Sequence, residues 1–216
     1  MSSLGRAFPL VIAAPSGAGK TSLARALVER HEDVVFSISA TTRPRRGYEE
    51  HGKDYYFVDD VAFDRMISSG ELLEWATVHG YRYGTPRQGV TECIRRGEVV
   101  VLDIDVQGAR QIRAVFPESV LVFVLPPSAV ELNRRLVGRG SEQESERRRR
   151  LEGARRELGD AVAFDYVIVN DDFDRAYQVL ESILLAERHR VSRAAGLDEL
   201  LERLDAELGN ILERSA

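Results

Sequence analysis

The stretch 13–21, AAPSGAGKT, constrains the fold more than any other part of this chain, because it joins an apolar run to a helical pattern through a glycine-rich turn. Gly17 and Gly19 lack the Cβ atoms that would keep backbone N–H groups from converging on phosphate oxygens. A helix that starts here adds its unpaired N-terminal donors. Lys20 can then reach the terminal phosphates, and Thr21 places a hydroxyl where Mg²⁺ would bridge two of them. The sequence therefore predicts a phosphate-binding loop.

The loop departs at one position from the strict pattern G-x-x-x-x-G-K-[ST], because Ala14 stands where the pattern has glycine. The core P-S-G-A-G-K-T is intact. The alternative is a tight strand-to-helix turn capped by Ser16, but such a turn needs neither two glycines nor a lysine and a threonine at these spacings. We expect nucleotide phosphates to be bound by Ala13, Ala14, Pro15, Ser16, Gly17, Ala18, Gly19, Lys20 and Thr21.

Composition limits the classes of protein that this chain can belong to. Its 216 residues, 44% of them hydrophobic and 30% charged, suffice for one folded domain with small insertions. The net charge of -5 argues against a nucleic-acid partner. Cys93 is the single cysteine, which fits a reducing compartment. The apolar run after Arg6 leads straight into the loop, so we read it as no export signal and expect a cytoplasmic protein without a membrane partner.

Apolar runs and helical patterns alternate along the chain, which is typical of a mostly parallel sheet with helices on both faces. Strands are predicted at 8–13, 34–39, 98–105, 120–125 and 166–169, with helices at 21–29, 61–69 and 86–96. Residues 38–96 contain a long polar and aromatic stretch that is a poor core element, so we expect an insertion there. The predicted fold class is α/β, a three-layer P-loop core with a five-stranded parallel sheet and an α+β insertion.

The C-terminal segment has apolar residues at helical spacing, and these are Leu200, Leu201, Leu204, Leu208, Ile211 and Leu212. Such a stripe either covers the domain or pairs two subunits as a homodimer. Packing on the domain is the interpretation that we favour.

Arginines and tyrosines cluster in the insertion, where they suit a second phosphate. Bidentate forks are offered by Arg43, Arg45 and Arg46, and neutral hydroxyl donors by Tyr55, Tyr56, Tyr81 and Tyr83. A solvated basic loop over a small aromatic core is the alternative. Glu74 favours the binding site, because a carboxylate matches the N1–H and amino group of guanine, whereas adenine would leave its buried charge unpaired.

These motifs resemble those of guanylate kinases of the bacterial type. The similarity runs from residue 8 to about residue 190 through APSGAGKT, SISATTR, GKDYYF, LLEWA, YRYGT, VVLDIDVQGA, VLPPS, RRLVGRG and VIVNDD. The resemblance implies a P-loop core (1–37, 97–137 and 160–190), a GMP-binding insertion (38–96) and a helical lid (138–159), with 191–216 as a helical tail. It also implies transfer of the γ-phosphoryl group of ATP to GMP, and we expect dGMP to react too, with Mg²⁺.

The resemblance assigns roles residue by residue. Around the guanine it implies Ser39, Glu74, Thr85 and Asp103, and on the GMP phosphate Arg43, Arg46, Tyr55 and Tyr83. The transferring group would meet Lys20, Arg46, Arg139 and Arg150, with Arg135 a weaker lid candidate, and the ATP adenine would lie near Asn170 and Asp171.

Two features of the sequence leave details open. Pro44 and Gly47 each stand one place earlier than in the family, although Arg46 keeps its spacing from Arg43 and Tyr55. Asp103 and Asp105 alternate along a strand, so they face opposite ways unless the strand has ended, and we assign Asp103 to the site. Other classes remain open as well: an interaction module without catalysis, a kinase for another nucleoside monophosphate, and a P-loop hydrolase.

Overall fold

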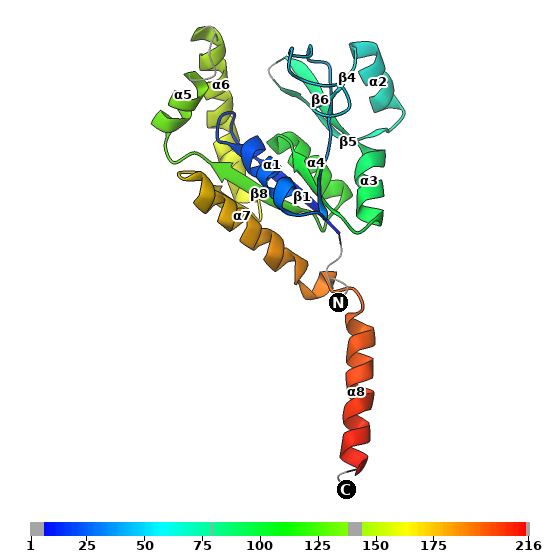
Figure 1. Ribbon diagram of the computed structural model, residues 1–216. Coiled ribbons are helices and arrows are strands. Elements are labelled where there is room, and N and C mark those ends of the chain that lie inside the picture. The colour runs from blue at the N-terminus through cyan, green and yellow to red at the C-terminus, as the bar shows by residue number, and fades with distance from the viewer. Residues whose placement is uncertain (1–6, 79, 138–143, 215–216) are drawn as a thin grey trace.

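The computed structural model describes residues 7–78, 80–137 and 144–214, and its core is a five-stranded parallel sheet (Figure 1). The strands are β1 (Pro9–Ala13), β2 (Val34–Phe36), β7 (Val99–Asp103), β8 (Val120–Leu125) and β9 (Tyr166–Val169), in the order β2-β7-β1-β8-β9. The predicted α/β class and strand number are confirmed. The second strand is shorter than predicted, because the chain leaves this sheet after Phe36.

Helices cover both faces of this sheet, so the core has three layers. On one face α1 (Lys20–Arg30) and α7 (Phe173–Arg188) pack against residues such as Leu10 and Ile12. On the other, α3 (Arg87–Arg95) and α4 (Val106–Val115) pack against residues such as Val11. Alternate residues of β1 thus point to opposite faces and are all buried, as expected of a central parallel strand.

A second, four-stranded sheet is built from residues between β2 and β7. It consists of β3 (Ala40–Thr41), β4 (Tyr56–Phe57), β5 (Leu72–Val78) and β6 (Tyr81–Pro86), with α2 (Asp60–Ser68) packed on it through Phe63. Gln111 of α4 joins this sheet to the core, because its side chain accepts from the backbone N–H of Trp75 at 3.2 Å and donates to the carbonyl of Trp75 at 2.9 Å.

Two further helices stand on the opposite side of α1 from the second sheet (Figure 1). They are α5 (Ala129–Val137) and α6 (Glu144–Glu157), and Leu132, Leu136 and Ala154 form a small hydrophobic cluster between them. A 3-10 helix, η1 (Leu158–Ala163), leads from α6 back to β9.

The C-terminal helix α8 (Leu197–Arg214) extends away from the body of the protein (Figure 1). All residues of α8 are described, and none is buried. The expectation that its apolar stripe covers the domain is therefore wrong. Gly196, at φ 73°, lies in the left-handed region that glycine adopts readily, and it turns the chain out of the 3-10 helix η2 (Val191–Arg193) into α8. Among the described residues, no helix is long and apolar enough to cross a membrane.

Candidate active site

The loop between β1 and α1 has the backbone that its glycines predict. Gly17 and Gly19 have φ values of 93° and 95°, in the left-handed region that residues with a Cβ atom rarely adopt. A Cβ atom on Gly19 would lie 2.2 Å from Nδ2 of Asn170, and this same amide donates to the carbonyl of Ala18 at 2.7 Å. Arg135 donates to the carbonyl of Asn170 at 3.0 Å. Asn170 and Arg135 therefore support the loop from the side of β9 and α5.

Lys20 and Thr21 both contact Asp103, which is the last residue of β7. Nζ of Lys20 donates to the carbonyl of Ile104 at 3.0 Å and forms an ion pair with Asp103. The hydroxyl of Thr21 donates to Asp103 at 2.5 Å. The loop cation, the hydroxyl and a strand-end carboxylate thus form one polar cluster at the carboxyl edge of the sheet.

Asp103 was expected beside the guanine. It is the last residue of β7, and its carboxylate contacts Lys20 and Thr21 of the phosphate loop. Asp105 caps α4 and accepts from the N–H of Gly108 at 2.9 Å. The negative charge of Asp105 raises the pKa of Glu74.

Glu74 and Thr85 are paired and buried on neighbouring strands of the second sheet. They are opposite in the register of β5 and β6, with exposed fractions of 3% and 0%, and the hydroxyl of Thr85 donates to Oε1 of Glu74 at 2.6 Å. Burial raises the pKa of Glu74 to about 7, the hydrogen bond from Thr85 opposes that rise, and the positive charge of Lys20 lowers the pKa further. Lys20 is therefore near enough to act electrostatically on Glu74.

Gly108 explains how a helix can approach this carboxylate so closely. A Cβ atom at this position would lie 2.4 Å from Oε2 of Glu74 and 3.0 Å from its Cδ. The first turn of α4 can therefore pass beside Glu74 only because residue 108 has no side chain.

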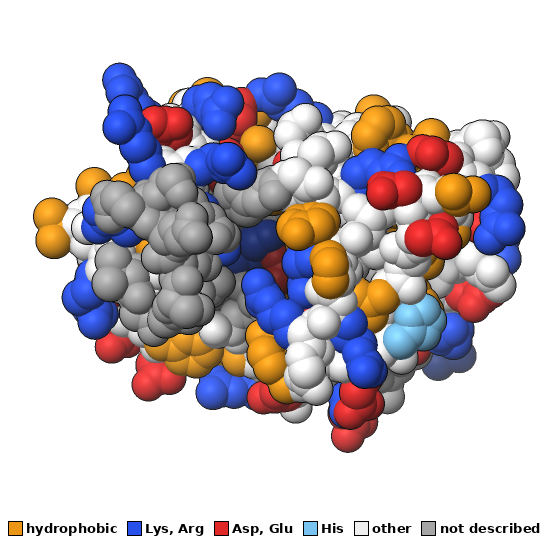
Figure 2. Space-filling model, turned by 90° about the horizontal axis from the view of Figure 1, so that it is seen from above, with side chains coloured by type: hydrophobic (Ala, Val, Ile, Leu, Met, Phe, Trp, Pro, Cys, Tyr) orange, Lys and Arg blue, Asp and Glu red, His pale blue; other side chains and the backbone are white. Residues whose placement is uncertain are grey.

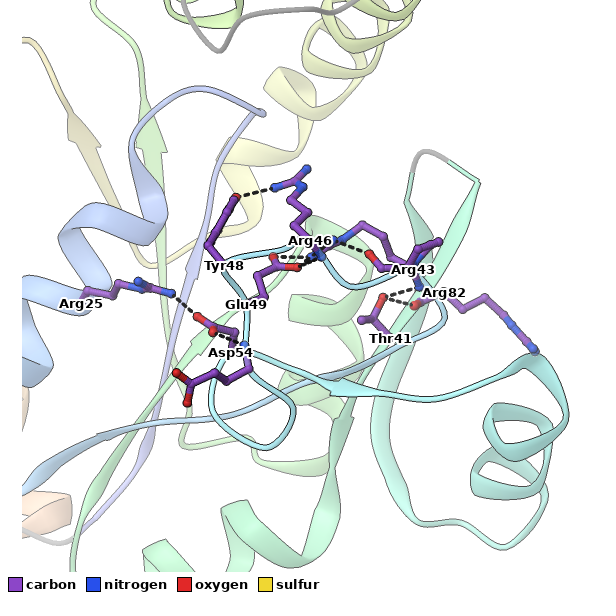
Figure 3. A network of polar contacts seen from close by, with 10 residues as sticks. Arg25, Thr41, Arg43, Arg46, Tyr48, Glu49, Asp54 and Arg82 are labelled. Carbon is purple, nitrogen blue, oxygen red and sulfur yellow. Dashed lines mark hydrogen bonds and ion pairs between the residues drawn. The ribbon is translucent and has the colours of Figure 1, made fainter.

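The turn after β3 is organised by a buried acid that the sequence did not single out. Figure 3 shows Glu49 between Arg43 and Arg46. Glu49 accepts from both terminal nitrogens of Arg43, at 2.7 and 3.0 Å, and from the backbone N–H of Arg46 at 2.8 Å. Burial by itself would lower the pKa of Arg43, but the hydrogen bonds to Glu49 and Tyr83 and the negative charges of these two groups together raise that pKa above its usual value. Glu49 thus holds the side chain of Arg43 and the backbone of Arg46 within the same turn.

Two tyrosines stand beside Arg43. The rings of Tyr55 and Tyr83 lie edge to face with centroids 6.0 Å apart, and the guanidinium of Arg43 is 5.4 Å from the Tyr55 ring centroid. Burial raises the pKa of Tyr55 to about 12, and the negative charge of Asp103 raises it further. Asp103 belongs to the phosphate loop cluster, so the aromatic and arginine cluster lies within its electrostatic reach. The two predicted anion sites are neighbours.

Figure 2 looks down on the face of the molecule that lies uppermost in Figure 1, and it shows Lys and Arg side chains within a hollow. Arg46 is exposed, and its guanidinium donates to the hydroxyl of Tyr48 at 3.4 Å (Figure 3).

The other predicted site residues lie around these clusters. Arg150 is on α6, the carbonyl of Ser39 accepts from Tyr56 at 2.9 Å, and Asp171 pairs with Arg175 at 3.1 Å. Arg139 falls outside the described residues. One further acid, Glu157, is the last residue of α6. Burial raises its pKa to about 7, the negative charge of Asp105 raises it further and the positive charge of Lys20 lowers it. No short motif around Glu157 pointed to a site.

A phosphate loop with a strand-end acid beside it, an arginine and tyrosine cluster, and a buried carboxylate are the features expected of a P-loop kinase that acts on nucleoside monophosphates. A family model described as guanylate kinase matches residues 6–187. The chain belongs to the guanylate kinase family.

Individual relatives agree with this. A guanylate kinase of Myxococcus xanthus is 49% identical over 185 residues, which is 85% of this chain and 88% of that protein. One of Syntrophotalea carbinolica is 50% identical over 183 residues, which is 85% of this chain and 87% of that protein. The crystal structure of guanylate kinase from Anaplasma phagocytophilum is similar with a TM-score of 0.78 and 39% identity, covering 92% of this chain and 95% of that one.

Proposed function

We propose that the protein transfers the γ-phosphoryl group of ATP to the phosphate of GMP and releases ADP and GDP. The observation that carries this proposal is the buried pair of Glu74 and Thr85, held next to a phosphate loop whose Lys20 acts electrostatically on the same carboxylate.

Base selection follows from the hydrogen-bonding inventory of Glu74. An ionised carboxylate only accepts hydrogen bonds, and guanine presents donors at N1 and at its amino group. Adenine presents an acceptor at N1 and would leave the buried carboxylate without a partner, which carries a large desolvation cost. Asp105 adds negative charge next to Glu74, which strengthens the preference for a base edge made of donors. The deoxy nucleotide dGMP has the same base and is expected to react too.

The two phosphate groups have separate positions. Residues 13–21 would hold the phosphates of ATP, with Lys20 at the terminal ones. Arg43, Arg46, Tyr55 and Tyr83 would hold the phosphate of GMP. An anionic phosphate oxygen needs no general base to attack, so catalysis rests on alignment and on cations that balance the charge spreading over the γ-phosphoryl oxygens. Arg46 is the exposed arginine of this set, free to reach toward the transferred group.

Mg²⁺ fits the cluster at the carboxyl edge of the sheet. The hydroxyl of Thr21 and the carboxylate of Asp103 are the oxygen donors that Mg²⁺ prefers, and they lie 2.5 Å apart beside the loop. When bound with ATP, the ion would neutralise charge on the β- and γ-phosphates. Thr21 and Asp103 would orient it from the protein side.

The remaining assignments concern the lid and the adenine. We propose that Arg150 and Arg139 approach the γ-phosphoryl group when the lid closes, and that Asn170 and Asp171 lie near the adenine of ATP. Closure excludes water, which limits hydrolysis of ATP without an acceptor. We also place the protein in the cytoplasm, which its single cysteine supports.

The test is a coupled assay of ADP release from ATP with GMP, AMP, dTMP or no acceptor. We expect turnover with GMP and little with the other three. Faster turnover with AMP or dTMP would support a kinase for another monophosphate, and release without an acceptor would support a hydrolase. Absence of turnover with every acceptor, together with a folded protein, would favour the interaction module.

A further inference from the structure

The apolar stripe of α8 has the spacing of a coiled-coil seam. Leu197, Leu201, Leu204, Leu208 and Ile211 follow one another at alternating intervals of four and three residues. This is the a and d pattern of a heptad repeat, in which one face of a helix meets a partner helix. Leu201, Leu204, Leu208 and Ile211 are 53%, 43%, 58% and 59% exposed, so the seam faces solvent within one chain.

An isolated helix of this kind has only marginal stability in water. Helices of about this length gain most of their stability from packing of an apolar face, and α8 of 18 residues has no buried residue along its fully described range. Gly209, within α8, costs about 1 kcal/mol relative to alanine. The apolar face of α8 therefore calls for a partner outside the chain.

The chain just before α8 is held against the domain. Arg193, with 3% exposure, donates to the carbonyl of Glu118 at 2.8 Å, pairs with Glu187 at 3.0 Å and stacks over the ring of Phe8. From this anchor the helix extends for about 27 Å. The matched family range ends at residue 187, so α8 follows the catalytic fold.

The charges of α8 favour a second copy over an anionic surface. The helix has six acids and two arginines, so membranes rich in anionic lipid and nucleic acids would repel it. None of the five seam positions is charged. In a parallel pair of these helices, Asp205 flanks Leu200 of the second copy and Glu207 flanks Leu212, so no like charges meet. Two antiparallel registers pair four seam positions each. One places Asp205 against Asp205 and Glu207 against Glu207, and the other places Asp198 against Asp205, so like charges meet in both.

We propose that α8 forms a parallel two-helix coiled coil with α8 of a second copy of this chain, so that the protein is a homodimer held through its C-terminal helix. The dimer goes beyond the phosphotransfer reaction, because α8 contributes no residue to the site described above. If the protein is an active monomer, the inference of a dimer is wrong and the proposed phosphotransfer reaction still stands.

The test is the mass in solution by sedimentation velocity over a wide range of protein concentration. The chain has a mass of 24.2 kDa, and we expect about twice that value at the higher concentrations. The double variant Leu204→Glu, Leu208→Glu places charges in the seam and should be monomeric over the same range, with its turnover retained. A wild-type protein that stays monomeric, or a double variant that stays dimeric, would overturn the proposal.

A matched control adds the same charges to the opposite side of the helix. Ala206 and Asn210 lie outside the seam, so the variant Ala206→Glu, Asn210→Glu should remain a dimer. Hydrogen exchange provides a second measurement, because amides of residues 197–214 should become protected as the protein concentration rises. Equal protection of these amides in the wild type and in the seam variant would contradict pairing through α8.

Discussion

Replacement of Glu74 by glutamine tests the base-reading part of the site most directly. The substitution keeps the size of the side chain and one oxygen that can accept from Thr85, but it replaces the second oxygen with an amide that donates. That amide would face a donor of guanine. We therefore expect Glu74→Gln to weaken GMP binding specifically and to leave the KM for ATP nearly unchanged.

The size of the effect follows from the bonds that are lost. Hydrogen bonds to a charged group contribute about 1.5–3 kcal/mol each, and the variant loses one of two and gains a donor opposite a donor. A loss of about 3 kcal/mol corresponds to about a hundredfold rise in the KM for GMP. Near pH 7 the free-energy cost of ionising Glu74 reduces this loss of about 3 kcal/mol only slightly, because the pKa of this carboxyl is about 7 in the free protein.

The dependence on pH has a definite sign. Burial raises the pKa of Glu74 from 4.5 to about 7, so the folded protein holds a proton through this window that the unfolded chain has lost. This group therefore stabilises the fold least above pH 7, and there Glu74→Gln should unfold at the same temperature as the wild type or a higher one. GMP needs the ionised form, so the wild-type KM for GMP should rise as the pH falls below 7.

Steady-state kinetics over a range of pH, with thermal unfolding of both proteins, would measure these effects. The phosphate of GMP also titrates near pH 6, and the glutamine variant is the control for that, because it keeps the phosphate and lacks the carboxylate. A KM for GMP within about threefold of wild type in Glu74→Gln, or the same pH dependence in both proteins, would refute the role of this residue.

Three other substitutions probe neighbouring parts of the site. Arg46→Ala should lower kcat about a hundredfold without a change in unfolding temperature, since the exposed guanidinium makes only a long hydrogen bond, to Tyr48, within the part of the chain that the structure describes. Unchanged turnover would contradict its role. Gly108→Ala would place a methyl group 2.4 Å from Glu74, so the KM for GMP should rise while that for ATP stays the same, and an unaffected KM for GMP would show that the helix shifts freely. Thr21→Ala should raise the Mg²⁺ concentration that gives half-maximal rate, measured by titration at fixed ATP, and an identical titration would exclude the hydroxyl as a ligand.

Local signals in the sequence were enough for the core of the fold. The strands at 120–125 and 166–169 have the predicted bounds, because short apolar runs between polar turns specify buried parallel strands. The loop 13–21 was equally readable, since its glycines, lysine and threonine act through consecutive backbone positions. Resemblance to one family then extended the interpretation to residues far apart in the chain.

Contacts between distant segments decided what the sequence left open. Glu49 lies six residues after Arg43 without a motif, and only the folded turn reveals that it orients this arginine. The pKa of Glu74 depends on burial between β5, β6 and α4, which no spacing along the chain encodes.

The sequence by itself determined the sheet, the phosphate loop and the kinase family, because these depend on short-range patterns of apolar and glycine residues. The tertiary structure alone decided that Asp103 serves the phosphate loop while Asp105 caps α4, since this depends on where a strand stops and a helix begins. It also decided that α8 leaves the domain. An amphipathic stripe indicates that a partner is needed, but only the structure shows that this stripe is exposed to solvent after the turn at Gly196.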